Sequence, residues 1–188
     1  MNKNNINIII ATFLVLAAAS ARIVNAGLNL HNFVPIAAIS LFSGFAFKEK
    51  RAWAILVPML GQFLADVYFQ FFTFIPGFYS VVDQLFNYTA IAGATALGFS
   101  MKQHKAINVL GFTLGSSMIF FLVSNLGFFM HGWNGYSFAG FTKTYIDAIP
   151  FYTNSFIADM VGGVVLFGGY ALTINALSRK MQKAEVKA

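Results

Sequence analysis

The sequence predicts an all-α integral membrane protein with six transmembrane helices, and three observations lead to this fold class. Hydrophobic residues make up 58% of the 188 residues, whereas charged residues make up only 10%. The mean hydropathy is +0.70. The apolar residues form six runs, separated by short polar or basic segments. A soluble domain of this size does not sustain such a composition, so the chain is expected to fold in a lipid bilayer.

The six predicted spans follow one another within a single transmembrane domain. Within the domain 1–188 they cover about 6–21, 33–47, 52–72, 80–101, 106–130 and 154–178. The connection 131–153 is the one long link, and we expect it to form an outer lid, since long loops in compact domains are usually functional. A short interfacial helix near 140–148 fits within it. Pro150 should prevent a helix from continuing through this lid, and Asn154 or Ser155 should cap the last span.

The first apolar run has a second interpretation, as a secretory signal. Lys3 precedes it, and Ala19-Ser20-Ala21 resembles a cleavage site. We favour a retained first helix, because its removal would leave the remaining basic clusters on a chain with an odd number of spans.

Basic residues predict the orientation of the bundle. Ten of the twelve lie at a terminus or after an even-numbered span, namely Lys3, Lys48, Lys50, Arg51, Lys102, Lys105, Arg179, Lys180, Lys183 and Lys187. The positive-inside rule then places both termini in the cytoplasm, for a multi-pass protein of the cell inner membrane. Basic residues that fall in short clusters between apolar runs indicate topology, so we expect no nucleic acid partner despite the formal charge of +6.

Asp159 is the polar residue around which the candidate site is organised. It follows Pro150 and lies a turn inside the last apolar run, where a carboxylate is costly in lipid. Ser155, Asp159 and Gly163 recur at intervals of four residues and therefore share one helix face. The carboxylate is expected to face a protein interior or a water-filled cavity.

With this orientation, the other polar residues of the spans fall in the outer half of the membrane. The candidate substrate-binding residues are Asp66, Asp159, Asn125, Asn87, Asp83, Gln62, His31, Asn32, His131 and Trp133. The inner half has almost no ionisable group, so the continuous polar path that a channel or proton-coupled pump needs is missing. This one-sided polarity predicts a subunit that captures a substrate and depends on another component to move it.

Two other interpretations stay open for these carboxylates. Asp66 and Asp159 could be structural, hydrogen-bonded to Asn, Ser or Trp at the helix ends. They could also serve acid–base chemistry in an intramembrane enzyme, but no nucleophile elbow, catalytic triad or paired-metal motif accompanies them. We therefore predict neither an enzyme nor a bound cofactor, and the sequence leaves the question of a metal open.

The charge of the outer side predicts the charge of the ligand. All four aspartates lie there, Asp66, Asp83, Asp147 and Asp159, against only Arg22 and Lys143, which gives about −2 with neutral histidines. A cationic or metal-containing ligand is therefore favoured over an anionic one.

Several segments carry a resemblance to a known family. They are 32–38 (Asn-Phe-Val-Pro-Ile-Ala-Ala), 41–44 (Leu-Phe-Ser-Gly), the Asp66 region and 149–151 (Ile-Pro-Phe), on a chain with six spans and an Ala-rich first helix. The chain resembles the S components of energy-coupling factor vitamin transporters, and an uncharacterised bacterial family of transport-related membrane proteins grouped with them. The resemblance implies that a vitamin or metal binds between outer loops and helix ends. It also implies delivery by toppling against a transmembrane coupling subunit driven by two ATPases, with Ala17 and Ala21 as the docking face of the first helix.

The expected function is thus a substrate-binding membrane subunit of an importer, which captures a small cofactor-like ligand in an outer-leaflet pocket. The alternative is a structural or assembly subunit without a small-molecule ligand. In that case the Ala- and Gly-rich faces of the second, fourth and sixth spans would pack against partner helices.

Overall fold

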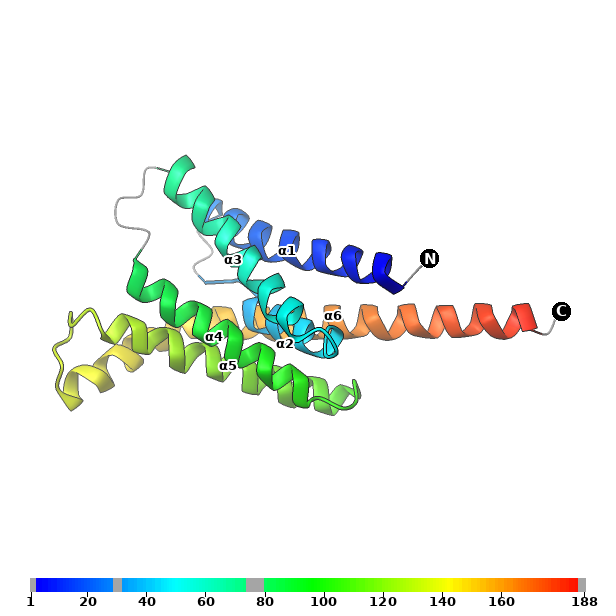
Figure 1. The fold of residues 1–188 in the computed structure, drawn as a ribbon. Coiled ribbons are helices and arrows are strands. Elements are labelled where there is room, and N and C mark those ends of the chain that lie inside the picture. Colours follow the sequence, from blue (N-terminus) through cyan, green and yellow to red (C-terminus); the bar gives the residue numbers. More distant parts are fainter. Residues whose placement is uncertain (1–2, 29–31, 74–79, 186–188) are drawn as a thin grey trace.

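Six helices and their connections make up the structure, a computed structural model that describes residues 3–28, 32–73 and 80–185. The helices are α1 (Lys3–Gly27), α2 (Ile36–Ala46), α3 (Arg51–Phe72), α4 (Val81–Ser100), α5 (Ala106–Phe129) and α6 (Phe138–Glu185). The described residues contain no strand, which confirms the all-α prediction. Figure 1 shows an elongated bundle, with both termini at the same end.

The surface and interior of the bundle have the polarity expected of a membrane protein. Large apolar side chains are exposed along the helices, among them Phe13, Leu56, Leu60, Leu114, Leu122, Val161 and Val164. Polar side chains are buried inside, including Ser40, Ser43, Gln62, Asp66, Thr95, Thr113, Ser116 and Asp159. Four helices, α1, α3, α5 and α6, are long and apolar enough to cross a bilayer. The chain is therefore a multi-pass membrane protein.

The short helix α2 lies at the centre of the bundle. Its 11 residues extend over roughly 17 Å, about half of a hydrocarbon core. Every residue from Ile36 to Gly44 is buried, because α2 packs against each of the other five helices. The apolar run 33–47 thus forms a central half-length helix, which is shorter than the span expected from the sequence.

Glycine allows α2 and α4 to approach closely. Cβ atoms added at Gly44 and Gly98 would clash with the main-chain carbonyls of Thr95 and Leu41 on the opposite helix. At the periphery, α1 packs mainly on α3, where a Cβ at Gly61 would lie 2.6 Å from the Ala18 Cβ. These small residues therefore form contacts within the chain.

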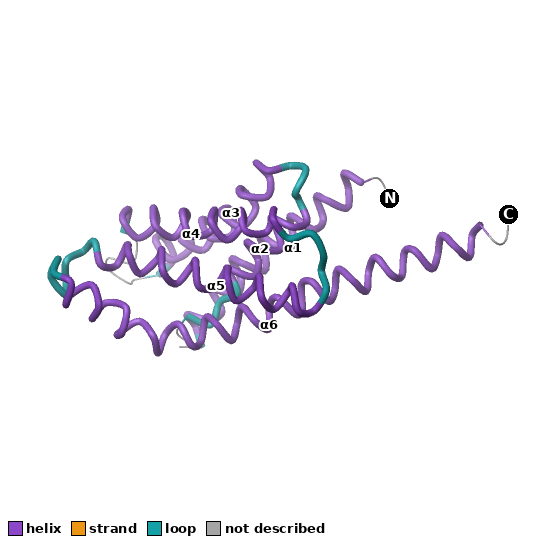
Figure 2. The backbone as a smooth tube through the Cα atoms, turned by 90° about the horizontal axis from the view of Figure 1, so that it is seen from below, coloured by secondary structure: helices purple, strands orange, loops and turns teal. Residues whose placement is uncertain are grey.

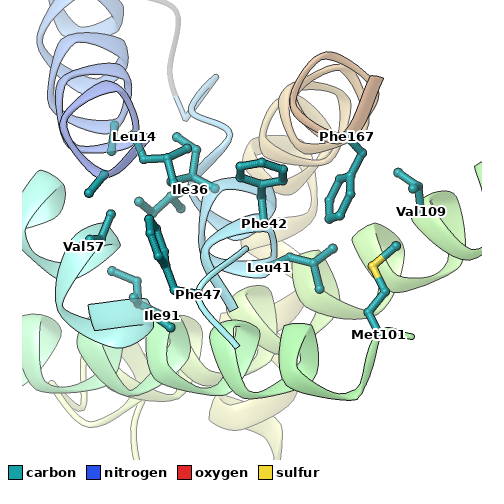
Figure 3. Close-up of a cluster of buried hydrophobic side chains, with 14 residues drawn as sticks. Leu14, Ile36, Leu41, Phe42, Phe47, Val57, Ile91, Met101, Val109 and Phe167 are labelled. Atoms are coloured by element: carbon teal, nitrogen blue, oxygen red, sulfur yellow. The ribbon is translucent and has the colours of Figure 1, made fainter. Parts of the chain in front are cut away.

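Apolar side chains fill the half of the bundle nearer the termini. Phe42, Phe47, Val57, Ile91, Met101 and Phe167 belong to one buried cluster, drawn in Figure 3 around α2. Phe42 and Phe167 meet edge to face, with ring centroids 5.1 Å apart. The links 47–50 and 101–105 and both termini lie at this end, and the link between α5 and α6 lies at the other (Figures 1 and 2).

The predicted lid 131–153 and the helix break at Pro150 are wrong. Helix α6 begins at Phe138 and continues through Pro150 to Glu185, so the link between α5 and α6 covers only 130–137. Proline removes one helical hydrogen bond and disfavours the preceding turn. Packing against α5 on both sides of Pro150 offsets this cost: the Tyr145 hydroxyl donates to the Leu122 carbonyl at 2.7 Å, and the Tyr152 ring lies against the Phe121 ring with centroids 4.4 Å apart. The helix bends in its first part instead of ending (Figure 2).

This correction also removes the predicted caps of the last span. Asn154 and Ser155 lie inside α6, where Ser155 does not cap a helix but donates its hydroxyl to the Asn32 carbonyl at 2.8 Å. A second correction concerns Arg22, which was expected in an outer link and lies within α1.

Candidate functional site: a polar cavity at the loop end of the bundle

A cavity of about 640 Å³ lies on the side of the bundle away from the termini. All six helices or their adjoining links contribute to it. Its polar and charged lining consists of Arg22, Asn32, Gln62, Asp83, Gln84, Asn87, Ser117, Ser124, Asn125, Asn134, Thr144, Asp147, Ser155 and Asp159. Its aromatic lining consists of Phe120, Phe121, Phe128, Trp133, Phe151 and Tyr152. Both groups follow helical spacing, so single faces of α4, α5 and α6 form most of the wall.

Asp159 lies at the floor of the cavity, where α2 begins. Its Oδ1 accepts a hydrogen bond from the Ala38 main-chain N–H at 3.1 Å, and the Ala37 N–H also reaches the carboxylate. Ser117 lies beside it without meeting hydrogen-bond geometry. The residue at the N-cap of α2 is Pro35, which supplies no side-chain hydrogen bond. The carboxylate of α6 therefore caps α2 from another helix, where the positive end of the helix dipole stabilises it.

Two further contacts fix α6 against this helix start. The Ser155 hydroxyl bonds the carbonyl of Asn32, which has a φ of 60°. A Cβ at Gly162 would lie 2.6 Å from the Pro35 Cβ, and one at Gly163 would lie 2.6 Å from the Thr113 Oγ1 of α5. The paired glycines thus let α6 fit between α2 and α5. Ser155 and Asp159 share a face as the sequence predicts, while Thr113 occupies the space left by Gly163.

Asp66 is buried behind the cavity wall. It is only 1% exposed, and its Oδ1 lies 2.5 Å from the Arg22 Nη1. Tyr88 donates its hydroxyl to the other carboxylate oxygen at 3.3 Å. Arg22 also donates to the Gln62 carbonyl at 3.3 Å and itself lines the cavity. Asp66 therefore neutralises a cavity-lining arginine and joins α1 to α3 and α4.

His131 joins the α5–α6 link to the start of α4. Its Nε2 lies 2.9 Å from the Asp83 Oδ1 and 3.4 Å from the Ser80 Oγ. Ser80 also caps α4, since its hydroxyl accepts the Asp83 N–H at 3.2 Å. Because Asp83 and Ser80 approach the same ring nitrogen, the three residues do not form a catalytic triad. Trp133 stacks on His131 with ring centroids 5.2 Å apart, at the rim of the cavity.

Aromatic rings line the cavity between α5 and α6. The Phe121 and Tyr152 rings have centroids 4.4 Å apart, and Phe128 and Trp133 meet edge to face at 4.8 Å. Gln84 of α4 also lines the cavity. Its side chain is 5% exposed, and its Oε1 has no hydrogen-bond partner. A buried acceptor without a partner is costly unless water or a ligand supplies a donor.

The structure brings most of the predicted site residues together. Asn32, Gln62, Asp83, Asn87, Asn125, Trp133 and Asp159 line the cavity. Asp66 and His131 lie outside its lining and contact the lining residues Arg22 and Asp83, respectively. His31 lies outside the described residues. The sequence prediction placed Ser155 on the Asp159 face but missed Arg22, Gln84, Ser117, Ser124, Thr144 and Tyr152 as lining residues. Helical spacing from Asp159 and Asn125 could have indicated Tyr152 and Ser117.

The donor set does not resemble a metal centre. Within the described parts of the chain, no three His, Asp or Glu side chains gather as metal ligands would. What the cavity offers is a row of amide and hydroxyl groups, aromatic faces and carboxylates. Such a combination can enclose a small organic molecule and fix its orientation by a few polar contacts.

Comparison with known proteins gives a family for this architecture. A family model matches residues 2–183, nearly the whole chain, and is described as a family of unknown function, DUF6580. The chain belongs to this family. No curated protein and no solved structure matches it.

Proposed function

We propose that this DUF6580 chain is the substrate-binding membrane subunit of an importer. It would lie in the cell inner membrane with six helices that alternate in direction, α2 reaching only about halfway, and with both termini in the cytoplasm, and it would capture a small cofactor-like ligand, such as a vitamin, from the outer side. The observation that carries the proposal is the cavity of about 640 Å³, which is large enough for a small organic molecule. Basic residues at the opposite end of the bundle support the orientation.

The apolar cluster below the cavity supports capture over conduction. Phe42, Phe47, Ile91 and Phe167 are buried in one cluster around α2 (Figure 3), and on their helices they lie beyond the cavity-lining residues Ile36, Asn87 and Asp159, toward the end of the bundle that holds the termini. A polar ligand bound beside Asp159 cannot cross this packed region without a rearrangement of the helices. Release to the cytoplasm therefore calls for a partner, for which a transmembrane coupling subunit driven by ATPases is the simplest arrangement.

A second candidate function is a structural or assembly subunit. One observation favours it: α6 projects beyond the bundle, and Leu172 and Ile174 on that part are exposed (Figure 1). Among the glycines that could serve a partner helix, Gly98 packs inside the chain against α2 and Gly162 against Pro35, whereas Gly168 and Gly169 of α6 have open space beside them and remain available to a partner. The capture function accounts for the cavity, which an assembly subunit does not need.

Ligand-induced thermal stabilisation tests the proposal. Purified protein is screened in detergent and in nanodiscs against vitamins, their precursors and metal complexes, and hits are confirmed by equilibrium binding. We expect one chemical group to stabilise the protein by an amount that grows with ligand concentration as linkage requires. Asn87→Leu, which removes a cavity amide, should weaken this response, whereas Asn108→Leu, near the start of α5 at the opposite end, should not. A stoichiometric membrane partner on a protein that binds no ligand would instead support the assembly function.

A further inference from the structure

The charges around the cavity are not evenly compensated. The guanidinium of Arg22 pairs with Asp66 behind the wall, at 2.5 Å, and so offers no free positive charge to a ligand. Asp83 pairs with His131, and Asp147 pairs with Lys143 at 2.6 Å. Among the described cavity-lining carboxylates, only Asp159 has main-chain amides and no basic side chain as its partners. The lining therefore presents an acidic floor.

A second feature points to a ligand that donates hydrogen bonds. Gln84 is 5% exposed and lines the cavity, and its Oε1 has no partner. Gln84 and Asp159 both line this cavity, so an amide and a carboxylate belong to the same wall. A ligand with two or more N–H donors would satisfy an acceptor that the protein leaves unpaired.

The aromatic wall favours an organic cation over an inorganic one. Phe121, Tyr152 and Phe128 line the cavity, and the face of an aromatic ring attracts a cation through its quadrupole, most strongly where water is excluded. A metal ion would need several His or carboxylate ligands at one point, and the described residues hold no such group. An organic cation is more weakly hydrated and can use rings, amide and carboxylate together.

We propose that the ligand of this cavity is an organic cation with N–H donors, a protonated amine or amidinium on a compact aromatic or aliphatic frame. Its charged group would lie toward Asp159 and Gln84, with its frame against the rings of α5 and α6. This inference rests on the proposed capture function and specifies its substrate class. The sequence favours a cationic or a metal-containing ligand, and of these two types we infer the organic cation.

Matched probe sets test the charge preference directly. The probes are benzamidine, benzamide and benzoate on one frame, and phenethylamine, 2-phenylethanol and phenylacetate on the other. Binding to the purified full chain is measured by ligand-observed NMR and thermal shift, with Zn²⁺ and Co²⁺ as metal probes. We expect the cation of each set to bind at least about tenfold more tightly than its neutral and anionic partners, as a charge-assisted hydrogen bond requires.

Variants locate the preference within the cavity. Asp159→Asn should reduce the advantage of each cation by about tenfold or more while leaving the neutral probes nearly unchanged. Gln84→Leu provides a second test that does not disturb the cap of α2, and it should weaken the amine and amidine by a similar factor. Glu49→Gln makes the same acid-to-amide change as Asp159→Asn at the opposite, exposed end of the bundle and should change no affinity.

The outcomes separate the two proposals. Equal or tighter binding of the neutral or anionic probes would overturn the organic-cation inference and leave capture intact, as would a cation advantage that survives both Asp159→Asn and Gln84→Leu. Saturable binding of Zn²⁺ or Co²⁺ that displaces the organic probes would overturn it in favour of a metal. If no probe of any charge binds the cavity, the organic-cation inference fails, whereas the capture function fails only if the vitamin panel gives no response either.

Discussion

Replacing Asp159 tests whether a side chain of α6 holds the start of α2 in place. In Asp159→Ala the main-chain N–H groups of Ala37 and Ala38 lose their acceptor at a buried helix end. Leaving a buried donor unsatisfied costs about 1–3 kcal/mol, so we expect the variant to lose stability in that range. Asp159→Asn keeps a side-chain oxygen at the same place and should lose about 1 kcal/mol or less, since Asn is as good a cap as Asp.

Two measurements are needed, one global and one local. Thermal unfolding in detergent reports the overall loss, and hydrogen exchange followed by mass spectrometry reports the α2 segment 36–46. We expect faster exchange in this segment for Asp159→Ala, and near-native protection for Asp159→Asn. Asp147→Ala is the matched control, because this half-exposed carboxylate of α6 bonds only Lys143 and its loss should cost at most about 1 kcal/mol. Native exchange and unfolding temperature in Asp159→Ala would refute the capping role.

Two further predictions concern packing and charge within the bundle. Asp66→Asn should destabilise the protein by about 3–5 kcal/mol, because it leaves the largely buried Arg22 without its counter-charge. The double variant with Arg22→Gln should recover part of this loss in a double-mutant cycle, and simple additivity would show that the pair is not coupled. Gly98→Ala should cost about 1–3 kcal/mol in thermal unfolding, since its methyl group would meet the Leu41 carbonyl. Gly111→Ala has open space and should be neutral or stabilising, and equal effects at both glycines would contradict the close α2–α4 approach.

Properties that depend on local spacing could be predicted from the sequence. The membrane class follows from composition, and the shared face of Ser155 and Asp159 follows from helical periodicity. Both predictions can be made without knowing which helices pack against the segment. The convergence of Asp83, Asn87 and Asn125 also follows, once alternating spans place all three in the same half of the bundle.

Features that depend on tertiary partners could not be predicted. Arg22 looks like the end of a span, because an unpaired arginine in lipid is costly, but Asp66 lies 44 positions away in the chain and offsets that cost. Pro150 looks like a helix end, because a proline costs about 3 kcal/mol in a helix interior. Contacts such as Tyr145 with Leu122 hold the flanking turns helical and compensate for it.

The start of α2 also sets the depth of the cavity. Pro35 disfavours a helical conformation for the residue before it, and α2 begins directly after this proline. Because the start of α2 forms part of the floor beside Asp159, each residue by which the proline is moved along the chain would move this part of the floor by about 1.5 Å. A shift of one helical turn would therefore change the length of molecule that the cavity accommodates by about 5 Å, without altering any lining side chain of α4, α5 or α6. Pro35 therefore helps to determine how deep the cavity reaches into the bundle.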